Sequence, residues 1–472
     1  MRRFAILAVG FTYLYFLFLS LRSVLWGGIP FWSDPARDLL LAWDNLRKIS
    51  LIGPPGGIPG VFYGPYWLWL NSLVLIFTKD PRFCSLFVIL LPYFTLFPLL
   101  LWKLSKFIGR GAAIVIWLVF MTTYGSFYTT YIWQPYLVPL FLVGIAYIAG
   151  NNILNKPLLV GIMAAMLVNF HLSFGIVTCL AVSALFFVTW LVKDRRLKTL
   201  ALYLAGVVTV FLPFIFFESR HGFNQVQAFM KAVINSAVYN SASVGQMGLT
   251  KAEILSRFLS IPAQFLQLPI GVVGVIWAIL LLQLKNKFTK NQIGILVFLF
   301  FNITGLFLIF YTSKNPVWDY YFIGMETLFL LLMGLLVSKS RFLVTLALVW
   351  SLVLFGKHVG NFVRDPGADF LSVPSIASKQ KTAETIIADA KNESYTVFAY
   401  SPSIYSFDYD YLFAWLAPNQ NFGPVTYLII PPDTSAAVKE DFIHYKTPDA
   451  KFVTVWEKVQ KDKTLIIKRW PR

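Results

Sequence analysis

Charged residues are scarce in this chain, and acidic residues are scarcer than basic ones. Of the 472 residues, 57% are hydrophobic and only 13% are Asp, Glu, Lys or Arg, which is about half the charged share of an average soluble domain. Long apolar runs recur from the N-terminus to about Phe355. The scarcity of charge excludes a soluble globular protein and predicts an all-α polytopic membrane protein.

Disulfides and metal-ligand clusters are also absent from the sequence pattern. The two cysteines, Cys84 and Cys179, lie in apolar runs without ligand-like neighbours, so no disulfide framework is predicted. No group of His, Cys and carboxylates has the spacing of metal ligands. The net charge of +18 belongs to the membrane part, because residues 358–472 hold thirteen acidic and thirteen basic residues. We therefore expect loop charges that fix topology, and no nucleic-acid partner.

Eleven apolar segments are predicted to span the membrane. The basic loops between them fall on the side of Arg2 and Arg3, so the positive-inside rule places the N-terminus in the cytoplasm and the C-terminus outside. The apolar run 64–78 is not counted, because it reaches only roughly 22 Å and a span needs ~30 Å. We expect it to be a juxtamembrane helix in the first outer loop. The predicted spans are about 4–25, 83–102, 111–131, 135–150, 157–170, 173–192, 197–217, 263–284, 291–311, 320–338 and 341–357.

Residues 358–472 are predicted to form a second domain, after a membrane domain of residues 1–357. An amphipathic helix over 377–391 is followed by short segments rich in strand-forming residues. We expect a small α/β domain on the outer face that serves as a lid or docking platform, because it contains no catalytic motif. Its predicted strands are 395–400, 425–430, 452–455 and 464–468.

Carboxylates are concentrated at the predicted outer face of the membrane domain. Only Asp194 falls in a predicted cytoplasmic loop, and only Glu326 falls inside a predicted span. A carboxylate within a span is costly unless it lines a cavity or has a partner. The other acids suggest work at the outer face, on a substrate reached from the membrane. The nine acids before His358 are Asp34, Asp38, Asp44, Asp80, Asp194, Glu218, Glu253, Asp319 and Glu326.

The first outer loop opens with Ser33-Asp34-Pro35-Ala36-Arg37-Asp38, and this segment is the main candidate for catalysis. Asp34 precedes a proline, which predicts the N-cap of a helix. At the boundary of lipid and water, the same carboxylate can act as a general base that takes a proton from an attacking hydroxyl. Asp38 lies one helical turn later and can face the same site. The simpler alternatives are a cap alone for Asp34 and a solvated surface for Asp38.

A second group of candidates, Glu218-Ser219-Arg220-His221, follows a predicted span. Arg220 presents a fork of donors that suits a phosphate, and His221 can add another donor. Glu218 is a candidate substrate ligand, and Lys314 in a later outer turn is a further candidate cation. The alternative for Arg220 is a side chain that snorkels at the end of a span.

Three further residues are candidates for substrate binding. His171 ends an apolar span at an outer turn, where the alternative is a structural hydrogen bond. Tyr66 lies in an aromatic segment of the first loop and can stack on a sugar ring, although an interfacial position also explains it. Asp319 lies in an outer turn seven residues before Glu326, on the same predicted helical face.

In their order along the chain, these motifs resemble those of the GT-C glycosyltransferases, in particular the bacterial protein-mannosyltransferase and lipid A aminoarabinose-transferase group. The resemblance covers residues 1 to about 357. Two departures concern Pro35, where family members often have Glu, and the outer loop 124–135, which lacks the acid that some members use to hold a metal. The motifs are the first-loop acids, Gly64-Pro65-Tyr66-Trp67, Phe170-His171-Leu172-Ser173, Glu218-Ser219-Arg220-His221 and Asp319-Tyr320-Tyr321-Phe322.

The resemblance implies transfer of a sugar from a polyprenyl-phosphate-linked donor to an acceptor outside the membrane, with Asp34 as the base. The acceptor stays open among a glycan, a lipid and a protein. No cofactor is expected to be required, and a divalent metal remains an open alternative. The rival hypotheses are a transporter or flippase of lipid-linked anions and an inactive relative that binds a lipid-linked sugar. Transporters often carry internal repeats, and this chain shows none, which favours the transferase.

Overall fold

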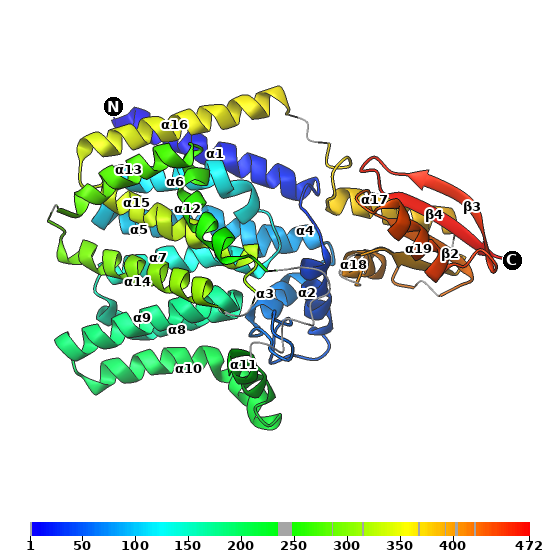
Figure 1. Ribbon diagram of the computed structural model, residues 1–472, viewed down its shortest axis with the longest axis horizontal. Helices are drawn as coiled ribbons and strands as arrows, with labels where there is room; N and C mark the ends of the chain where they lie inside the picture. The colour runs from blue at the N-terminus through cyan, green and yellow to red at the C-terminus, as the bar shows by residue number, and fades with distance from the viewer. Residues whose placement is uncertain are drawn as a thin grey trace.

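The computed structural model describes residues 2–234, 248–285, 287–313, 316–366, 369–391, 393–401, 405–419 and 422–472. A helical bundle is followed by a small domain of strands and helices (Figure 1), so the expected fold class is confirmed. The bundle and its loops contain α1 (Arg2–Leu25), α2 (Ser33–Asp44), α3 (Tyr66–Leu75), α4 (Pro81–Cys84), η1 (Ser85–Leu90), α5 (Leu91–Ile108), α6 (Arg110–Tyr128), η2 (Gln134–Leu137), α7 (Val138–Gly150), η3 (Ile153–Asn155), α8 (Pro157–Phe170), α9 (Leu172–Lys193), α10 (Leu197–Arg220), α11 (Asn224–Ile234), α12 (Lys251–Leu266), α13 (Ile270–Leu282), η5 (Gln283–Lys285), α14 (Lys290–Thr312), η6 (Asp319–Phe322), α15 (Met325–Val337) and α16 (Arg341–Arg364).

Among the described residues, seven helices are long and apolar enough to cross a membrane, or eight if the bent pair α12–α13 counts as one span. The remaining three predicted spans coincide with α1 and with the shorter apolar helices α7 and α8. Helices α8, α9 and α10 lie side by side along the bundle (Figure 1). These helices support a multi-pass membrane protein.

The predicted single span over residues 263–284 is instead two helices. Helix α12 ends at Leu266, α13 begins at Ile270, and their axes differ by 87°. The cause is local, because Gln267 has a left-handed backbone with φ of 52°, which ends an α-helix. Pro269 follows and cannot donate the hydrogen bond that would continue it.

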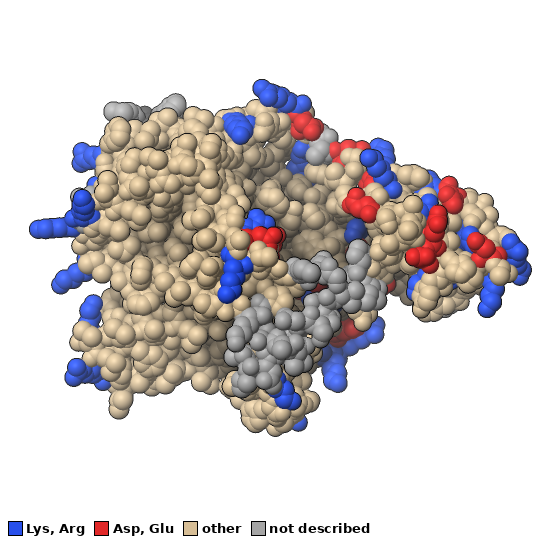
Figure 2. Space-filling view, in the orientation of Figure 1, with Lys and Arg blue, Asp and Glu red and all other residues tan. Residues whose placement is uncertain are grey.

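Charge is distributed unevenly between the two ends of the molecule. In the view of Figure 2, basic side chains alone are seen at the end of the bundle opposite the C-terminal domain, whereas acidic side chains lie on that domain and near it. We call the end next to the C-terminal domain the outer end. The one-sided basic residues agree with the positive-inside rule, and the orientation of the termini in the membrane stays a prediction.

The first outer loop folds into two short helices that pack together. Helix α3 has ten residues and reaches only about 15 Å, which agrees with the prediction that 64–78 does not span. The Ser72 hydroxyl of α3 donates to the carbonyl of Ala42 in α2 at 2.8 Å. The Asn45 side-chain amide donates to Ser72 Oγ at 2.9 Å. Helix α2, which carries the first acidic motif, is thereby fixed within the loop.

The C-terminal domain is a four-stranded sheet with three helices. Strand order is β1-β2-β4-β3, with β1 and β2 parallel and the other two pairs antiparallel. Helices α18 and α19 were not predicted. Helix α16 continues past residue 357, where the sequence analysis placed the boundary between the two domains. That boundary stays a prediction. The elements are α17 (Ile376–Ala390), β1 (Tyr395–Ala399), α18 (Phe407–Leu416), β2 (Val425–Ile430), α19 (Ala436–Lys446), β3 (Phe452–Val459) and β4 (Leu465–Pro471).

Hydrogen bonds fix this domain to the first outer loop. The backbone N–H of Ala377 donates to the carbonyl of Gly27 at 3.0 Å. The Tyr411 hydroxyl of α18 donates to the carbonyl of Lys79 at 2.8 Å. These bonds lie before and after α2 in the chain, and α18 packs on α2. The domain therefore supports the helix that carries the first acidic motif.

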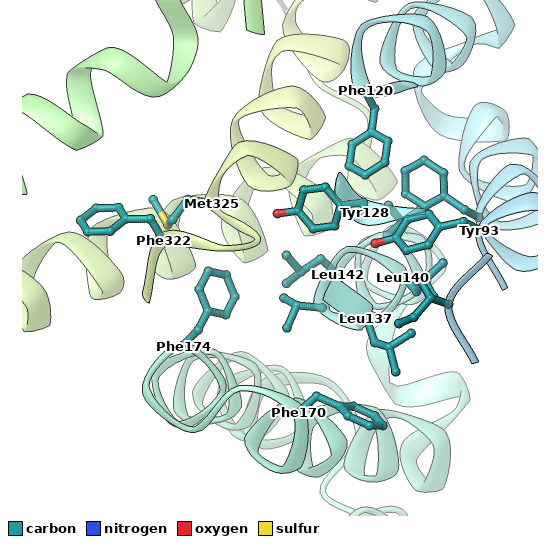
Figure 3. Packing of buried hydrophobic residues seen from close by; sticks show 14 of the residues in the cluster. Tyr93, Phe120, Tyr128, Leu137, Leu140, Leu142, Phe170, Phe174, Phe322 and Met325 are labelled. Atoms are coloured by element: carbon teal, nitrogen blue, oxygen red, sulfur yellow. The ribbon is translucent and has the colours of Figure 1, made fainter. Parts of the chain in front are cut away.

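A core of aromatic and aliphatic side chains joins the helices of the bundle (Figure 3). The rings of Phe120 and Tyr128 in α6 lie 5.2 Å apart, and Tyr93 of α5 lies 5.9 Å from Phe120. Phe322 and Met325 enter the same cluster from η6 and α15. Because close-packed side chains resist displacement, this core fixes the segments that hold the candidate residues.

Candidate active site

Asp34 lies in the first turn of α2, at the outer end of the bundle. The helix begins at Ser33, and its N-cap residue is Trp32, which makes no side-chain capping bond. The prediction that Asp34 is the N-cap is therefore wrong, because the extended backbone that precedes the helix belongs to Trp32. The Asp34 side chain is 47% exposed, and its Oδ1 accepts a hydrogen bond from Arg37 Nη1 at 2.9 Å. The carboxylate is thus open to a substrate.

Arg37 joins Asp34 to a second carboxylate one helical turn later. Asp38 is only 1% exposed, and its Oδ1 accepts hydrogen bonds from Arg37 Nη2 at 2.7 Å and from Nε at 3.0 Å. Burial raises the pKa of Asp38 to about 7, although the Arg37 charge opposes this shift. The solvated-surface alternative for Asp38 is therefore excluded. We call Asp34, Arg37 and Asp38 the α2 triad.

A wall of aromatic rings borders the α2 triad. The ring of Trp32 lies 5.7 Å from that of Trp133, and Trp133 lies 5.4 Å from Tyr320. Tyr320 and Tyr321 pack edge to face at 4.7 Å. Trp32 directly precedes α2 and lies two residues before Asp34, so this row of rings begins next to the α2 triad. Aromatic walls with a few polar groups are typical of small-molecule sites, and we call these four residues the aromatic wall.

The loop between α2 and α3 lies against the aromatic wall. A Cβ atom at Gly57 would lie 3.3 Å from the Tyr321 hydroxyl and 3.4 Å from the Tyr320 hydroxyl, so the loop backbone approaches both rings closely. Burial raises the pKa of the Tyr63 hydroxyl, and neighbouring Tyr321 and Asp38 raise it further. Tyr63 therefore keeps its proton at neutral pH and is available as a hydrogen-bond donor beside the α2 triad.

His171 is buried in the turn between α8 and α9, where it holds the aromatic wall in place. Its Nε2 lies 3.0 Å from the carbonyl oxygen of Tyr320, which only accepts, so Nε2 carries the proton. Burial lowers the pKa of His171 to about 4, and the ring is neutral at pH 7. The contact agrees with the structural alternative for His171, and its predicted role in substrate binding stays a prediction.

Glu326 fixes the other end of the turn that carries Tyr320. The Tyr128 hydroxyl donates to its carboxylate, and the Gly324 N–H donates to Glu326 Oε2 at 3.2 Å. Gly324 has φ of 105°, and a Cβ there would lie 2.7 Å from Val138 Cγ1, so both backbone and space require glycine. In Figure 3, Tyr128 lies between Tyr93 and the segment of Met325. The partner that a buried carboxylate needs is therefore present.

The second predicted group, at the end of α10, is arranged differently. Glu218 is 1% exposed and accepts hydrogen bonds from the backbone N–H groups of Gln225 at 3.1 Å and Val226 at 3.3 Å. These are at the N-terminus of α11, so Glu218 caps that helix. The His221 ring stacks on Phe217 with centroids 4.0 Å apart, and His221 Nδ1 bonds the Phe217 carbonyl at 2.7 Å.

Arg220 and its neighbour His221 are exposed. Within the described residues, no hydrogen bond or ion pair joins either of them to the α2 triad. The structure therefore does not bring the two predicted groups into contact. Lys314, the third predicted cation, lies outside the described residues.

Asp319 and Tyr66 make contacts that sequence reasoning did not anticipate. Asp319, directly before the aromatic wall, is 60% exposed and pairs with Arg257 of α12 at 2.8 Å. The Tyr66 hydroxyl donates to the carbonyl of Val210 in α10 at 2.9 Å. Tyr66 therefore ties α3 to α10, and no hydrogen bond of its hydroxyl to the α2 triad is found in the described chain. The roles of both residues in substrate binding stay predictions.

Four functional candidates were missed: Arg37, Tyr63, Trp133 and Arg257. A signal existed for Arg37 alone, since it lies three residues after Asp34, which places both on one helical face. The other three come from segments far from α2 in the sequence.

No group of three His, Cys, Asp or Glu residues in the described ranges is close enough to hold a metal ion, and metal dependence stays a prediction.

Comparisons with known proteins bear on the fold. The sequence matches no protein-family model and no curated protein sequence. The structure resembles the crystal structure of ArnT from Cupriavidus metallidurans bound to undecaprenyl phosphate, with a TM-score of 0.61 and 10% sequence identity. The match covers 98% of this chain and 97% of the other, so it includes both the helical bundle and the C-terminal domain.

Proposed function

Because this chain has the fold of the GT-C membrane glycosyltransferases, we propose that it transfers a sugar from a polyprenyl-phosphate-linked donor to an acceptor at the outer end. The bound undecaprenyl phosphate in the similar structure supports a lipid-linked donor. The observation that carries the proposal is the half-exposed Asp34, which accepts a hydrogen bond from the Arg37 guanidinium and lies two residues after Trp32 of the aromatic wall.

In the proposed reaction, Asp34 is the general base. An acceptor hydroxyl attacks the anomeric carbon of the donor sugar, and its proton passes to the Asp34 carboxylate. The bond between the anomeric carbon and the phosphate oxygen breaks, and its electron pair stays on the phosphate. The products are the glycosylated acceptor and the polyprenyl phosphate. The aromatic wall supplies the face on which the sugar ring packs.

Arg37 is the cation that meets the leaving phosphate. Its guanidinium is held in place by hydrogen bonds to Asp34 and Asp38, and a fixed positive charge stabilises the negative charge that develops as the bond breaks. Asp38 is a positioning residue, because its buried carboxylate holds Arg37 and does not reach the open space. Arg257, which pairs with Asp319 beside the aromatic wall, is the second cation available there.

The proposal is tested with membranes that contain the protein and its native acceptor. Donors with a short polyprenyl chain and an isotope-labelled sugar are added one at a time, and mass spectrometry measures release of polyprenyl phosphate and labelling of products. We expect one donor class to react with the wild type and not with Asp34→Asn. Asp44→Asn, at the other end of α2, is the matched control and should react normally. Equal turnover by Asp34→Asn would refute the assignment of the base.

A further inference from the structure

An apolar groove lies between α1, α5 and α6, and nothing described above uses it. Its volume is about 540 Å³. Helices α5 and α6 each contribute four residues at spacings of three, four and seven, which form one stripe along a helix. The stripes extend the groove along the helix axes for about 10 Å. The lining residues are Val9, Tyr13, Pro98, Leu101, Trp102, Ser105, Arg110, Ala113, Ile114 and Trp117.

One end of the groove is polar. It contains Ser105, at the end of α5, and Arg110, at the start of α6. The Arg110 guanidinium lies 5.5 Å from the centre of the Trp102 ring, and Trp102 is 60% exposed. None of the ion pairs of the described chain includes Arg110. An exposed tryptophan beside an arginine is typical of the boundary between hydrocarbon and headgroups.

The other end of the groove contains a buried donor without a partner. Trp117 is 5% exposed, and its indole N–H makes no hydrogen bond in the described chain. The ring of its neighbour Tyr13 stacks on Trp117 with the ring centroids 6.0 Å apart. The Tyr13 hydroxyl already has an acceptor within the chain. The Tyr13 hydroxyl donates at 2.6 Å to the carbonyl of Phe94, which Pro98 leaves free because it has no N–H. An unpaired donor in an apolar site is costly, so Trp117 calls for an acceptor from outside the chain.

We propose that this groove binds one acyl chain of an anionic glycerophospholipid from the bilayer. The phosphate pairs with Arg110, the chain fills the apolar stripe, and an ester carbonyl accepts from Trp117. Side chains on a helix tilt toward its N-terminus, which for α6 is the Arg110 end, so the Trp117 side chain leans from its own end of the groove toward Arg110. Arg110 lies in the short connection between α5 and α6, which is one of the basic loops that the positive-inside rule places in the cytoplasm.

Charge distinguishes this occupant from other membrane lipids. A zwitterionic lipid with identical chains offers the same carbonyls to Trp117 and the same hydrocarbon to the stripe. Its own ammonium group competes with Arg110 for the phosphate. The site therefore prefers phosphatidylglycerol to phosphatidylcholine, and this preference depends on Arg110.

The test measures lipid binding to the delipidated full-length protein in detergent by native mass spectrometry. Phosphatidylglycerol and phosphatidylcholine with the same chains are titrated against the wild type, Arg110→Ala and Lys106→Ala. Lys106 is exposed at the end of α5 and does not line the groove. We expect about a tenfold preference for phosphatidylglycerol, the order of one charged hydrogen bond. Lys106→Ala should retain the preference, and Arg110→Ala should lose it.

A second pair of variants tests the apolar stripe and the buried donor. Ile114→Phe fills the groove and should weaken binding of both lipids by about tenfold or more. Trp117→Phe keeps the ring but removes the donor, so it should weaken both lipids by severalfold and leave their ratio unchanged. Equal binding of the two lipids by the wild type would overturn the proposal. So would an unchanged preference in Arg110→Ala, or unchanged affinities in Ile114→Phe.

Discussion

The α2 triad and the end of α10 look alike in sequence and differ in structure. Each segment follows a predicted span and places an acid within three residues of an arginine. In the triad, Arg37 is held by three hydrogen bonds between an exposed and a buried carboxylate. At the end of α10, the acid turns inward to cap α11, and Arg220 is left exposed.

The difference shows that the hydrogen-bond partners of an acidic side chain determine its role more than its neighbours in the sequence do. Asp34 leaves one face of its carboxylate open beside the aromatic wall, so it can still accept a proton. Glu218 uses Oε2 to accept from two backbone N–H groups, which are otherwise unsatisfied at a helix start, and its Oε1 is buried with no hydrogen-bond partner among the described residues. The following predictions test this contrast by changing equivalent residues in the two groups.

The largest expected effect is that of Asp34→Asn. The change keeps the size of the side chain and its hydrogen bond from Arg37, and it removes the basicity. General-base loss costs about 10²- to 10⁴-fold in rate, so sugar transfer should fall by that factor with donor binding nearly unchanged. Turnover and donor affinity are measured on the same detergent-solubilised preparation. A fall in affinity with normal turnover would make Asp34 a binding residue.

Arg37→Ala should weaken binding of a short polyprenyl phosphate more than Arg220→Ala does. Hydrogen bonds to charged groups are worth about 1.5–3 kcal/mol, which corresponds to a roughly ten- to hundred-fold loss for Arg37. Arg220→Ala should change the affinity by less than about threefold, because no hydrogen bond or ion pair from the described residues fixes its guanidinium. Arg37→Lys and Arg220→Lys are the charge-preserving controls. If Arg220→Ala weakened binding more than Arg37→Ala did, Arg220 would be the phosphate ligand that the sequence analysis predicted.

The sequence predicted well those features that depend on neighbours along the chain. The apolar runs gave the helices of the bundle, and the length of α3 followed from one short run. The three-residue spacing of Asp34 and Arg37 is one at which two side chains of a helix can form an ion pair. Pro269 also predicts the break after α12, which the sequence analysis did not include.

Contacts between distant segments could not be predicted in this way. The aromatic wall joins Trp32 to Trp133 and Tyr320, and no periodicity relates these positions. Helix α18 was missed because its sequence is rich in aromatic residues that also suit strands, and its helical form is supported by packing on α2. The role of Glu218 depends on where α11 begins, which the hydrophobic pattern leaves open.

A smaller effect is expected in the dependence of activity on pH. Below its pKa of about 7, Asp38 is protonated and loses its charged hydrogen bonds to Arg37, so kcat/KM should fall as pH falls through 7 and then level off at a loss no larger than that of Arg37→Ala. Stability should change in the opposite direction. The folded state binds the extra proton between about pH 4 and 7, so the stability contribution of Asp38 declines as pH rises through that range. Asp38→Asn should remove both trends.

The smallest effect on transfer, and a clear effect on stability, is expected for Glu218→Ala. The change removes the acceptor for two N–H groups of α11, and loss of a helix cap costs about 0.5–2 kcal/mol. The thermal midpoint should fall by a few degrees, whereas transfer per folded molecule at low temperature should change less than about twofold. Glu218→Gln keeps an acceptor oxygen and should restore most of the midpoint. If Glu218→Ala instead abolished transfer at an unchanged midpoint, the carboxylate would contact the substrate, and the two groups would be alike in function after all.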